Sequence, residues 1–339
     1  MDEMTTEAYK GVWVLGEVRN GNVHPVSHEL LAWGRGLADK LGVDLSIVVL
    51  GTRLEDKVEG LIFGGADRIL MVDHPALEHF TLDPYAAILT ALIREEKPAI
   101  LIASATTQGR SLMPVLAVKV GAGLTADCTE LDIDPETGLL IQTRPAVGGN
   151  IMATIKTPSF RPQMATVRPK SKRPLELDPA RKGEIKVKTF PEDLFRSRVK
   201  HLGFIPEASG GAPIQDAETV VAFGKGLKEG KHVTLIQELA RLLDGSVGAS
   251  RSAIDAGWIS YSHQVGLSGK TVSPRLYVAC GISGAVQHLA GMSSAETIVA
   301  VNADPEAPIF NVADYGIVGD LFEILPLWID KLKTAKKGD

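Results

Sequence analysis

Short apolar runs alternate with stretches of helical spacing through the first half of the chain. The runs are rich in β-branched residues and predict strands. Between them leucines fall on one helical face, as at Leu30, Leu37 and Leu41, which are seven and four positions apart, and this spacing predicts an amphipathic helix. The predicted strands cover residues 11–18, 44–51, 68–72 and 99–104, and the predicted helices cover residues 26–41, 83–96 and 110–119. This alternation indicates crossover units in a parallel sheet.

The alternation of strand and helix patterns ends after residue 124. Three strand-like runs, at residues 139–144, 150–156 and 163–168, follow one another without a helical pattern between them. Consecutive strands without crossover helices are typical of antiparallel pairing. We therefore expect an antiparallel or mixed edge on the first sheet.

Residues 168–200 form a proline-containing stretch in which Lys and Arg outnumber Asp and Glu. This stretch reads as a solvated connector with an extended arm near residues 184–189, and a docking surface for an acidic partner is the alternative. Gly210 and Gly211 then predict a hinge. We place the domain boundary near residue 207, which divides the chain into an N-terminal domain (1–207, with 168–207 as the basic connector or arm) and a second domain (208–339).

Strand and helix patterns begin again in the second domain. The predicted strands cover residues 219–223, 246–247, 275–279, 297–301 and 315–318, and the predicted helices cover residues 232–243 and 320–333. The pattern is that of a second doubly wound sheet. The sequence therefore predicts an α/β protein of two domains, an N-terminal α/β sheet domain with a mixed edge and a C-terminal doubly wound parallel-sheet domain.

The composition of the 339 residues is that of a globular protein. Apolar residues make up 45% and charged residues 23%, which excludes a disordered or collagen-like chain. The net charge is −5, whereas nucleic-acid-binding proteins are normally basic, so we expect no nucleic acid among the partners.

Two cysteines, Cys128 and Cys280, are too few for a disulfide framework or a four-thiolate iron–sulfur cluster, and we expect no metal site. The acidic N-terminus lacks the features of a signal or transit peptide. No apolar run approaches the roughly 20 residues of a membrane span. A cytoplasmic protein without membrane insertion is therefore expected.

Small and polar residues follow several strands of the second domain, where open parallel sheets bind ligands. Ser283–Ala285 is a candidate cradle for a pyrophosphate, supplemented by Ser250, because glycine allows close backbone approach and helix starts attract phosphate oxygens. Asn302 and Asp320 can hydrogen-bond a ribose or an adenine edge. Any one of these loops could simply end a strand and cap a helix, but four in one sheet favour a nucleotide.

A polar loop at residues 261–270 has neither helical nor strand-like spacing. The hydroxyl of Ser268 and the N–H of Gly269 are candidate contacts to a flat heterocycle. Its composition alone does not identify such a ligand.

Four long motifs of the second domain resemble the α-subunit of electron transfer flavoproteins. They are VGASRSAIDAGW at residues 247–258, HQVGLSGKTVSP at 263–274, CGISGAVQHLAGM at 280–292 and NADPEAPIFNVADYGIVGDLFEILP at 302–326. Shorter matches at residues 124–129, 144–153 and 161–169 extend the resemblance through the first domain. The resemblance implies that the doubly wound domain is an FAD-binding domain with one FAD, and that the N-terminal domain contacts a β-subunit in a heterodimer.

The resemblance also implies roles for individual residues. Arg251 matches an arginine over the isoalloxazine ring, Ser268 a hydroxyl near N5, and His288 a histidine near the C2 carbonyl. Because a guanidinium stays charged and stabilises negative charge on a reduced ring, Arg251 should dominate, and His288 should contribute strongly only when protonated. The other cofactor-binding positions are Lys225, Gln264, Val265, Gly266, Leu267, Gly269, Ala285, Val286 and Gln287, with Ser250, Ser283 and Gly284 at the diphosphate and Asn302, Asp320 and Leu321 at the adenosine end.

Three positions depart from the family pattern. Lys225 stands for a commoner arginine, Leu267 for a glutamine and Ser268 for a threonine. Lys225 keeps the charge but loses the bidentate fork, and Leu267 removes a polar neighbour of the ring. These departures leave the reduction potential of the flavin undetermined, but they do not argue against flavin binding.

Residues 143–150 (TRPAVGGN) resemble the electron-bifurcating branch of the family. The resemblance implies that Arg144 reaches a second FAD, which the β-subunit holds and NADH reduces. One electron would then pass through the FAD of this chain to an acyl-CoA dehydrogenase, and the other to ferredoxin or flavodoxin. Without the resemblance, we would interpret Arg144 as an exposed arginine on an edge strand, whose ion pair contributes little to the stability of the fold.

Two other functions stay open at this point. One is a non-bifurcating electron transfer flavoprotein whose heterodimer holds one FAD and one AMP. The other, from a different class, is a nucleotide-sensing interaction module without a redox function. The flavin content of the heterodimer distinguishes the three.

Overall fold

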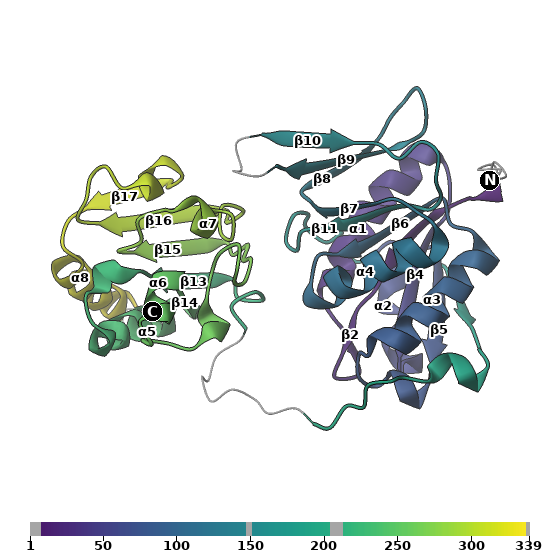
Figure 1. Cartoon of the computed structure of the whole chain (residues 1–339), viewed down its shortest axis with the longest axis horizontal. Helices are drawn as coiled ribbons and strands as arrows, with labels where there is room; N and C mark the ends of the chain where they lie inside the picture. The colour runs from purple at the N-terminus through teal and green to yellow at the C-terminus, as the bar shows by residue number, and fades with distance from the viewer. Residues whose placement is uncertain (1–7, 147–150, 204–212, 337–339) are drawn as a thin grey trace. The chain divides into compact units, whose positions relative to one another are not determined.

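The computed structural model describes residues 8–146, 151–203 and 213–336 (Figure 1). The chain divides into two compact units, unit 1 over residues 1–204 and unit 2 over residues 205–339. The boundary that we predicted near residue 207 and the hinge at Gly210 and Gly211 lie outside the described residues.

Unit 1 is built on a seven-stranded sheet in which all neighbouring strands pair in parallel. Side chains of its central strand alternate between two cores, with Val12 and Val14 in one, and Trp13 and Leu15 in the other. Both faces are therefore covered, as is usual for parallel sheets. In spatial order the strands are β12 (Glu184–Val187), β5 (Arg68–Asp73), β4 (Leu45–Gly51), β1 (Val12–Leu15), β6 (Ile100–Ser104), β11 (Gln163–Val167) and β7 (Leu124–Cys128).

The helices of unit 1 follow the predicted alternation. They are α1 (Val26–Leu41), α2 (Gly60–Phe63), α3 (Leu82–Glu96) and α4 (Thr107–Val120). Helix α1 packs Leu30 and Leu37 on the face that carries Val12. Helices α3 and α4 cover the opposite face through Leu89 and Leu112, which pack with Trp13.

The antiparallel strands that we expected at an edge of this sheet form a separate sheet of their own. It consists of β8 (Glu130–Ile133), β9 (Leu140–Pro145) and β10 (Met152–Ile155). The third strand predicted there, β11, instead lies inside the main sheet, parallel to β6 and β7. All five residues of β11 are buried, as expected for a strand covered on both faces. A short ribbon of β2 (Val18–Arg19) and β3 (Asn22–Val23) precedes α1.

The basic stretch at residues 168–200 packs along unit 1 through β12, which pairs with β5 at one edge of the main sheet. Several of its cations form ion pairs within the unit. Lys188 contacts Glu95 at 2.9 Å and Glu96 at 2.5 Å, and Arg181 and Arg198 pair with aspartates of unit 1 at 2.6 and 3.0 Å. These basic residues therefore stabilise the arm against its own unit.

Unit 2 contains a five-stranded parallel sheet, as the sequence predicts. In spatial order the strands are β14 (Ser246–Ala249), β13 (Thr219–Phe223), β15 (Leu276–Cys280), β16 (Thr297–Asn302) and β17 (Tyr315–Val318). Chain order runs one way from β13 to β14 and the other way from β15 to β17. The direction of winding therefore reverses between β13 and β15, and doubly wound sheets bind ligands beyond the carboxyl ends of such strands.

Two long helices, α5 (Val233–Leu242) and α8 (Leu321–Ala335), cover one face of this sheet (Figure 1). The other face carries loops and the short helix α7 (Val286–Leu289), with Val265, Ile282 and Ile309 in its core. A second short helix, α6 (Arg251–Asp255), follows β14. Across residues 8–146, 151–203 and 213–336, no helix is both long and apolar enough to cross a bilayer.

Candidate functional site

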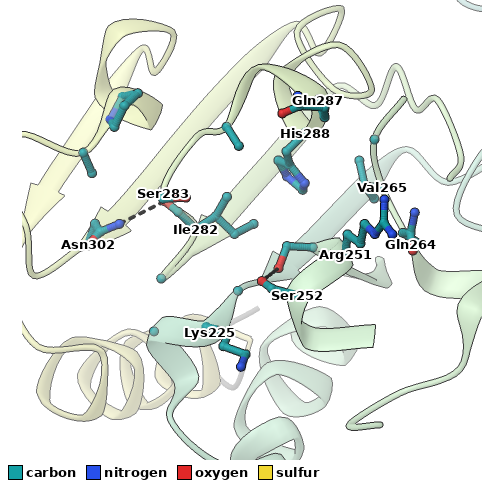
Figure 2. Close-up of a pocket in the computed structure, with 18 of the residues that line it drawn as sticks. Lys225, Arg251, Ser252, Gln264, Val265, Ile282, Ser283, Gln287, His288 and Asn302 are labelled. Atoms are coloured by element: carbon teal, nitrogen blue, oxygen red, sulfur yellow. Dashed lines mark hydrogen bonds between the residues drawn. The ribbon is translucent and has the colours of Figure 1, made fainter. Parts of the chain in front are cut away.

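A cavity of about 660 Å³ opens in unit 2 at the carboxyl ends of its strands, in the size range of small-molecule sites (Figure 2). It lies where the winding reverses, because Gly224–Gly226 after β13 and Gly281–Ser283 after β15 both line it. Thirteen predicted cofactor residues line the cavity: Lys225, Ser250, Arg251, Gln264, Val265, Gly266, Leu267, Ser268, Ser283, Ala285, Gln287, His288 and Asn302.

Two glycines allow the backbone segments beside this cavity to pack closely. Gly281 has a φ of 61°, and a Cβ on it would lie 2.8 Å from the Gly226 Cα, so the loops after β13 and β15 touch backbone to backbone. Gly284 has a φ of 91°, and a Cβ there would lie 2.3 Å from the Ile309 backbone nitrogen. Both conformations disfavour a side chain, so a glycine at each position allows this close packing of the backbone. Of the two, Gly281 lines the cavity and Gly284 lies behind its lining.

We expect Gly284→Ala to destabilise unit 2 by about 2 kcal/mol or more, because the new Cβ meets the Ile309 backbone and strains a left-handed residue. Gly257→Ala is the matched control, since Gly257 has a φ of 72° but nothing within 4 Å of its Cβ position. Urea unfolding of both variants measures the difference. Equal losses would mean that the contact with Ile309 does not matter.

Arg251 begins α6, and its side chain extends toward Gln264 and Val265 along the cavity wall (Figure 2). The side chain is 72% exposed, and its Nε lies 3.5 Å from a carboxylate oxygen of Asp255, one helical turn later. Asp255 also lines the cavity. The cation predicted from the sequence therefore stands beside a carboxylate that offsets part of its charge.

The loop at residues 264–270 closes another side of the cavity. The Gln264 side-chain amide donates to the Ser268 hydroxyl oxygen at 3.0 Å, which leaves the Ser268 O–H available to the cavity. Backbone hydrogen bonds tie the loop at both sides, from Val265 to the Ala249 carbonyl at 2.9 Å and from Leu267 to the Gln287 carbonyl at 2.7 Å. The loop is thus anchored to the end of β14 and to α7.

His288 lies on α7, is only 6% exposed and points into the cavity (Figure 2). The Tyr277 hydroxyl of β15 lies 2.9 Å from its Nε2, and its Nδ1 is buried without a hydrogen-bond partner among the described residues. Burial lowers the pKa of His288 to about 4, although a poorly aligned contact with the Val265 backbone, which accepts from the imidazole, acts to raise the pKa. The imidazole is therefore neutral near pH 7, so the condition under which we expected His288 to contribute strongly, protonation, is not met at that pH.

Asn302 lines the cavity, but both ends of its amide are engaged. Its Nδ2 donates to the Ile282 carbonyl at 2.9 Å, and its Oδ1 accepts from the Asp304 backbone at 3.0 Å. Asn302 therefore joins the loops after β15 and β16, which sequence reasoning did not foresee.

Five predicted positions do not line the cavity: Gly269, Gly284, Val286, Asp320 and Leu321. The Asp320 carboxylate accepts from the Phe322 backbone at 2.8 Å and caps α8, whereas Leu321 is buried in the core beneath. Contacts from Asp320 and Leu321 to an adenosine group stay a prediction. The cavity also includes residues that we did not predict: Gly224, Gly226, Ser252, Asp255, Gly281, Ile282, Asp304, Ala307 and Pro308. Gly224 and Gly281 stand directly after a strand, and Gly226, Ile282 and Asp304 follow a strand within three residues, which is the pattern that could have identified these five.

Arg144 belongs to unit 1, on β9, where it pairs with Ala153 of β10. Burial raises the pKa of Asp127, but the Arg168 guanidinium, which donates to that carboxylate at 2.8 Å, lowers the pKa overall. The charge of Arg144 adds a smaller lowering effect. Burial raises the pKa of Cys128 to about 12, and Arg144 opposes that shift. Arg144 thus lies in a charged cluster at the carboxyl end of β7. Residues 147–150 of its motif lie outside the described residues.

No group of three or more His, Cys, Asp and Glu side chains that could hold a metal ion occurs in the described parts of the chain.

Comparisons with known proteins cover both units. Residues 12–193 match the electron transfer flavoprotein domain, and residues 213–293 match the electron transfer flavoprotein FAD-binding domain. The electron transfer flavoprotein subunit alpha of Thermoanaerobacterium thermosaccharolyticum is 49% identical over 330 residues, which cover 97% of this chain and 99% of that protein.

Two other relatives carry more specific names. The acryloyl-CoA reductase electron transfer subunit beta of Anaerotignum propionicum is 40% identical over 98% of this chain and 98% of its own. The lactate dehydrogenase (NAD(+),ferredoxin) subunit LctC of Acetobacterium woodii is 42% identical over 94% of this chain and 76% of its own. With both units matched and a relative of near-equal length at this identity, the chain belongs to the family of electron transfer flavoprotein α-subunits.

Proposed function

We propose that this chain is the α-subunit of an electron-bifurcating heterodimer with a β-subunit, and that the cavity of unit 2 holds one FAD. In this proposal NADH delivers two electrons to a second FAD in the β-subunit. One electron leaves through the FAD of unit 2 to an acyl-CoA dehydrogenase, and the other leaves to ferredoxin or flavodoxin.

The observation that carries the proposal is the cavity at the carboxyl ends of β13 and β15, with Arg251 at its rim and His288 in its wall. FAD fits the donor set there. The close glycine backbone suits a diphosphate, the planar guanidinium suits a flat ring, and the buried His288 Nδ1 lacks a partner among the described residues. When bound, FAD supplies a ring that accepts and passes on single electrons.

The residues of the cavity would then set how easily the ligand takes up negative charge. Arg251 stabilises such charge electrostatically, and Asp255 beside it weakens that effect. Ser268 presents its O–H to the cavity because its oxygen already accepts from Gln264. This chain therefore contributes binding and charge stabilisation rather than proton transfer.

The bifurcating form of the proposal is supported by Arg144 and by the names of two relatives. Arg144 stands in the motif that resembles the bifurcating branch. One relative is named as a subunit of a lactate dehydrogenase (NAD(+),ferredoxin), and the other as an electron transfer subunit of acryloyl-CoA reductase. Together these names include a nicotinamide nucleotide, ferredoxin and an enzyme that acts on an acyl-CoA, which are the three classes of redox partner in the proposal.

The experiment that tests the proposal is an anaerobic NADH titration of the purified heterodimer, with its flavins counted and each acceptor supplied alone and together. We expect two FAD per heterodimer and reduction of ferredoxin or flavodoxin that depends on the acyl-CoA dehydrogenase and its substrate. One FAD and one AMP, with no NADH oxidation, would instead identify the non-bifurcating carrier. A heterodimer that stays colourless after incubation with FAD would overturn both.

A further inference from the structure

We propose that Tyr277 is a positioning residue that holds the proton of His288 on Nδ1, so that the imidazole presents a neutral N–H donor to a carbonyl-type acceptor in the cavity. The inference rests on the proposed function only for the identity of that acceptor, which would be a carbonyl of the flavin ring. The arrangement of the two side chains stands on the geometry of unit 2 alone.

The two side chains form a buried pair between different elements. Tyr277 lies on β15 and is fully buried, and His288 lies on α7 at 6% exposure. The Tyr277 Oη and the His288 Nε2 are 2.9 Å apart, and the two rings are inclined by 58°. The hydrogen bond therefore joins the sheet to the helix that forms the cavity wall.

The direction of this hydrogen bond follows from what each partner can do. Burial holds the pKa of Tyr277 well above its ordinary value, so the hydroxyl keeps its hydrogen. Among the described residues, its only hydrogen bond is the one to His288. If Nε2 carried the imidazole proton, the Tyr277 O–H would be buried without an acceptor, at a cost of about 1–3 kcal/mol. Tyr277 therefore donates, and Nε2 accepts.

The proton of a neutral imidazole must then reside on Nδ1. Nδ1 is buried and makes no hydrogen bond of full geometry among the described residues. The Val265 backbone raises the pKa of His288, as an acceptor of the imidazole proton would, but its contact is too poorly aligned to satisfy Nδ1. A buried donor without an acceptor is unfavourable, and His288 lines the cavity, so an acceptor atom of a ligand there would satisfy it. A carbonyl oxygen that gains negative charge would accept this hydrogen bond more strongly than a neutral one.

The first test uses nitrogen-15 spectra of the histidine-labelled heterodimer after its FAD has been removed. We expect the His288 signals to show a protonated Nδ1 and an unprotonated Nε2 at pH 7, assigned by their loss in His288→Gln. In Tyr277→Phe the signals should move toward a mixture of the two tautomers. A wild-type His288 that carries its proton on Nε2, or an unchanged tautomer in Tyr277→Phe, would overturn the inference.

The second test measures FAD affinity in the same heterodimers. Tyr277→Phe should bind FAD roughly three- to tenfold more weakly, and it should have no further effect in a His288→Gln background. An equal loss in both backgrounds would show that Tyr277 acts without His288.

Tyr85→Phe is the matched control, because Tyr85 is a buried tyrosine of unit 1 whose hydroxyl donates to the Leu77 carbonyl at 3.2 Å. A heterodimer that shows the expected tautomer but binds no FAD would overturn the proposed function and leave the positioning role of Tyr277 intact.

Discussion

Arg251→Ala should lower the reduction potential of the FAD bound in unit 2 by up to about 170 mV. A charge pair at about 4 Å contributes about 4 kcal/mol at an effective dielectric constant of 20, and about 1.4 kcal/mol corresponds to 59 mV for one electron. The guanidinium is 72% exposed and stands 3.5 Å from Asp255, so solvent and that carboxylate reduce the effect below this figure. Anaerobic potentiometric titration of the heterodimer measures the change.

Two variants separate the charge of Arg251 from its shape and from general surface effects. Arg251→Lys keeps the charge and should recover most of the potential. Arg275→Ala is the matched control, because Arg275 is also exposed and paired with a carboxylate, at 3.9 Å from Glu296. It precedes β15 at the amino end of that strand, whereas the cavity opens at the carboxyl ends. If a folded, flavin-loaded Arg251→Ala heterodimer kept its midpoint potentials, Arg251 would not have the role assigned to it.

Arg144→Ala should chiefly disturb the flavin that reacts with NADH, and leave the flavin of unit 2 nearly unchanged. Loss of one hydrogen bond from a charged donor removes about 1.5–3 kcal/mol, which corresponds to roughly 65–130 mV for one electron. Coupled reduction of ferredoxin or flavodoxin should therefore fall at least tenfold. Spectral titration with NADH, in which the two flavins are followed separately, provides the measurement.

The control for Arg144 comes from the same charged cluster. Arg110 of α4 lies 3.5 Å from the Asp127 carboxylate, which also feels the charge of Arg144. Arg110→Ala removes a cation from the cluster but leaves β9 intact, and should have little effect on either flavin. A spectral change confined to the flavin of unit 2 in Arg144→Ala would mean that Arg144 has been assigned to the wrong cofactor.

Much of the fold could be predicted because local patterns carry it. The helix predicted over residues 26–41 is α1, since its leucine spacing and the glycine that follows mark both its face and its end. The strands predicted at 219–223 and 315–318 are β13 and β17. The strand predicted at 246–247 extends to Ala249, because pairing with β13 includes Gly248 and Ala249, whose own strand propensity is low.

The position of β11 could not be read from its sequence. Residues 163–168 have the same local pattern whether they pair with β10 in an antiparallel sheet or with β6 in a parallel one. Register is decided by partners that lie about 60 residues apart in the chain, such as Gln163 and Ile100. A local pattern therefore predicted the strand but assigned it to the wrong sheet.

The candidate site also contains some features that the sequence predicts and others that depend on residues far apart in the chain. The carboxyl-end rule identified the loops that carry Arg251 and Ser283, because strand ends are visible in the sequence, whereas the loop with Ser268 was identified by its polar, irregular composition. Asp255 was missed although its spacing of four residues from Arg251 on a helix indicates a pair. The charge state of His288 could not be predicted, because its pKa is set by burial and by the backbone of Val265, which lies in another loop.

The insertion of β11 between β6 and β7 has a consequence for synthesis on the ribosome. Both flanking strands leave the exit tunnel before β11 does, and the segment that forms β8, β9 and β10 emerges in between. Until then the nascent chain cannot complete its main sheet, and the facing edges of β6 and β7 lack their common partner. Translation must therefore pass residue 167 before β6 and β7 can be joined, and residue 187 before the edge strand β12 completes the sheet. We expect chains that stall before these points to be the form most exposed to aggregation.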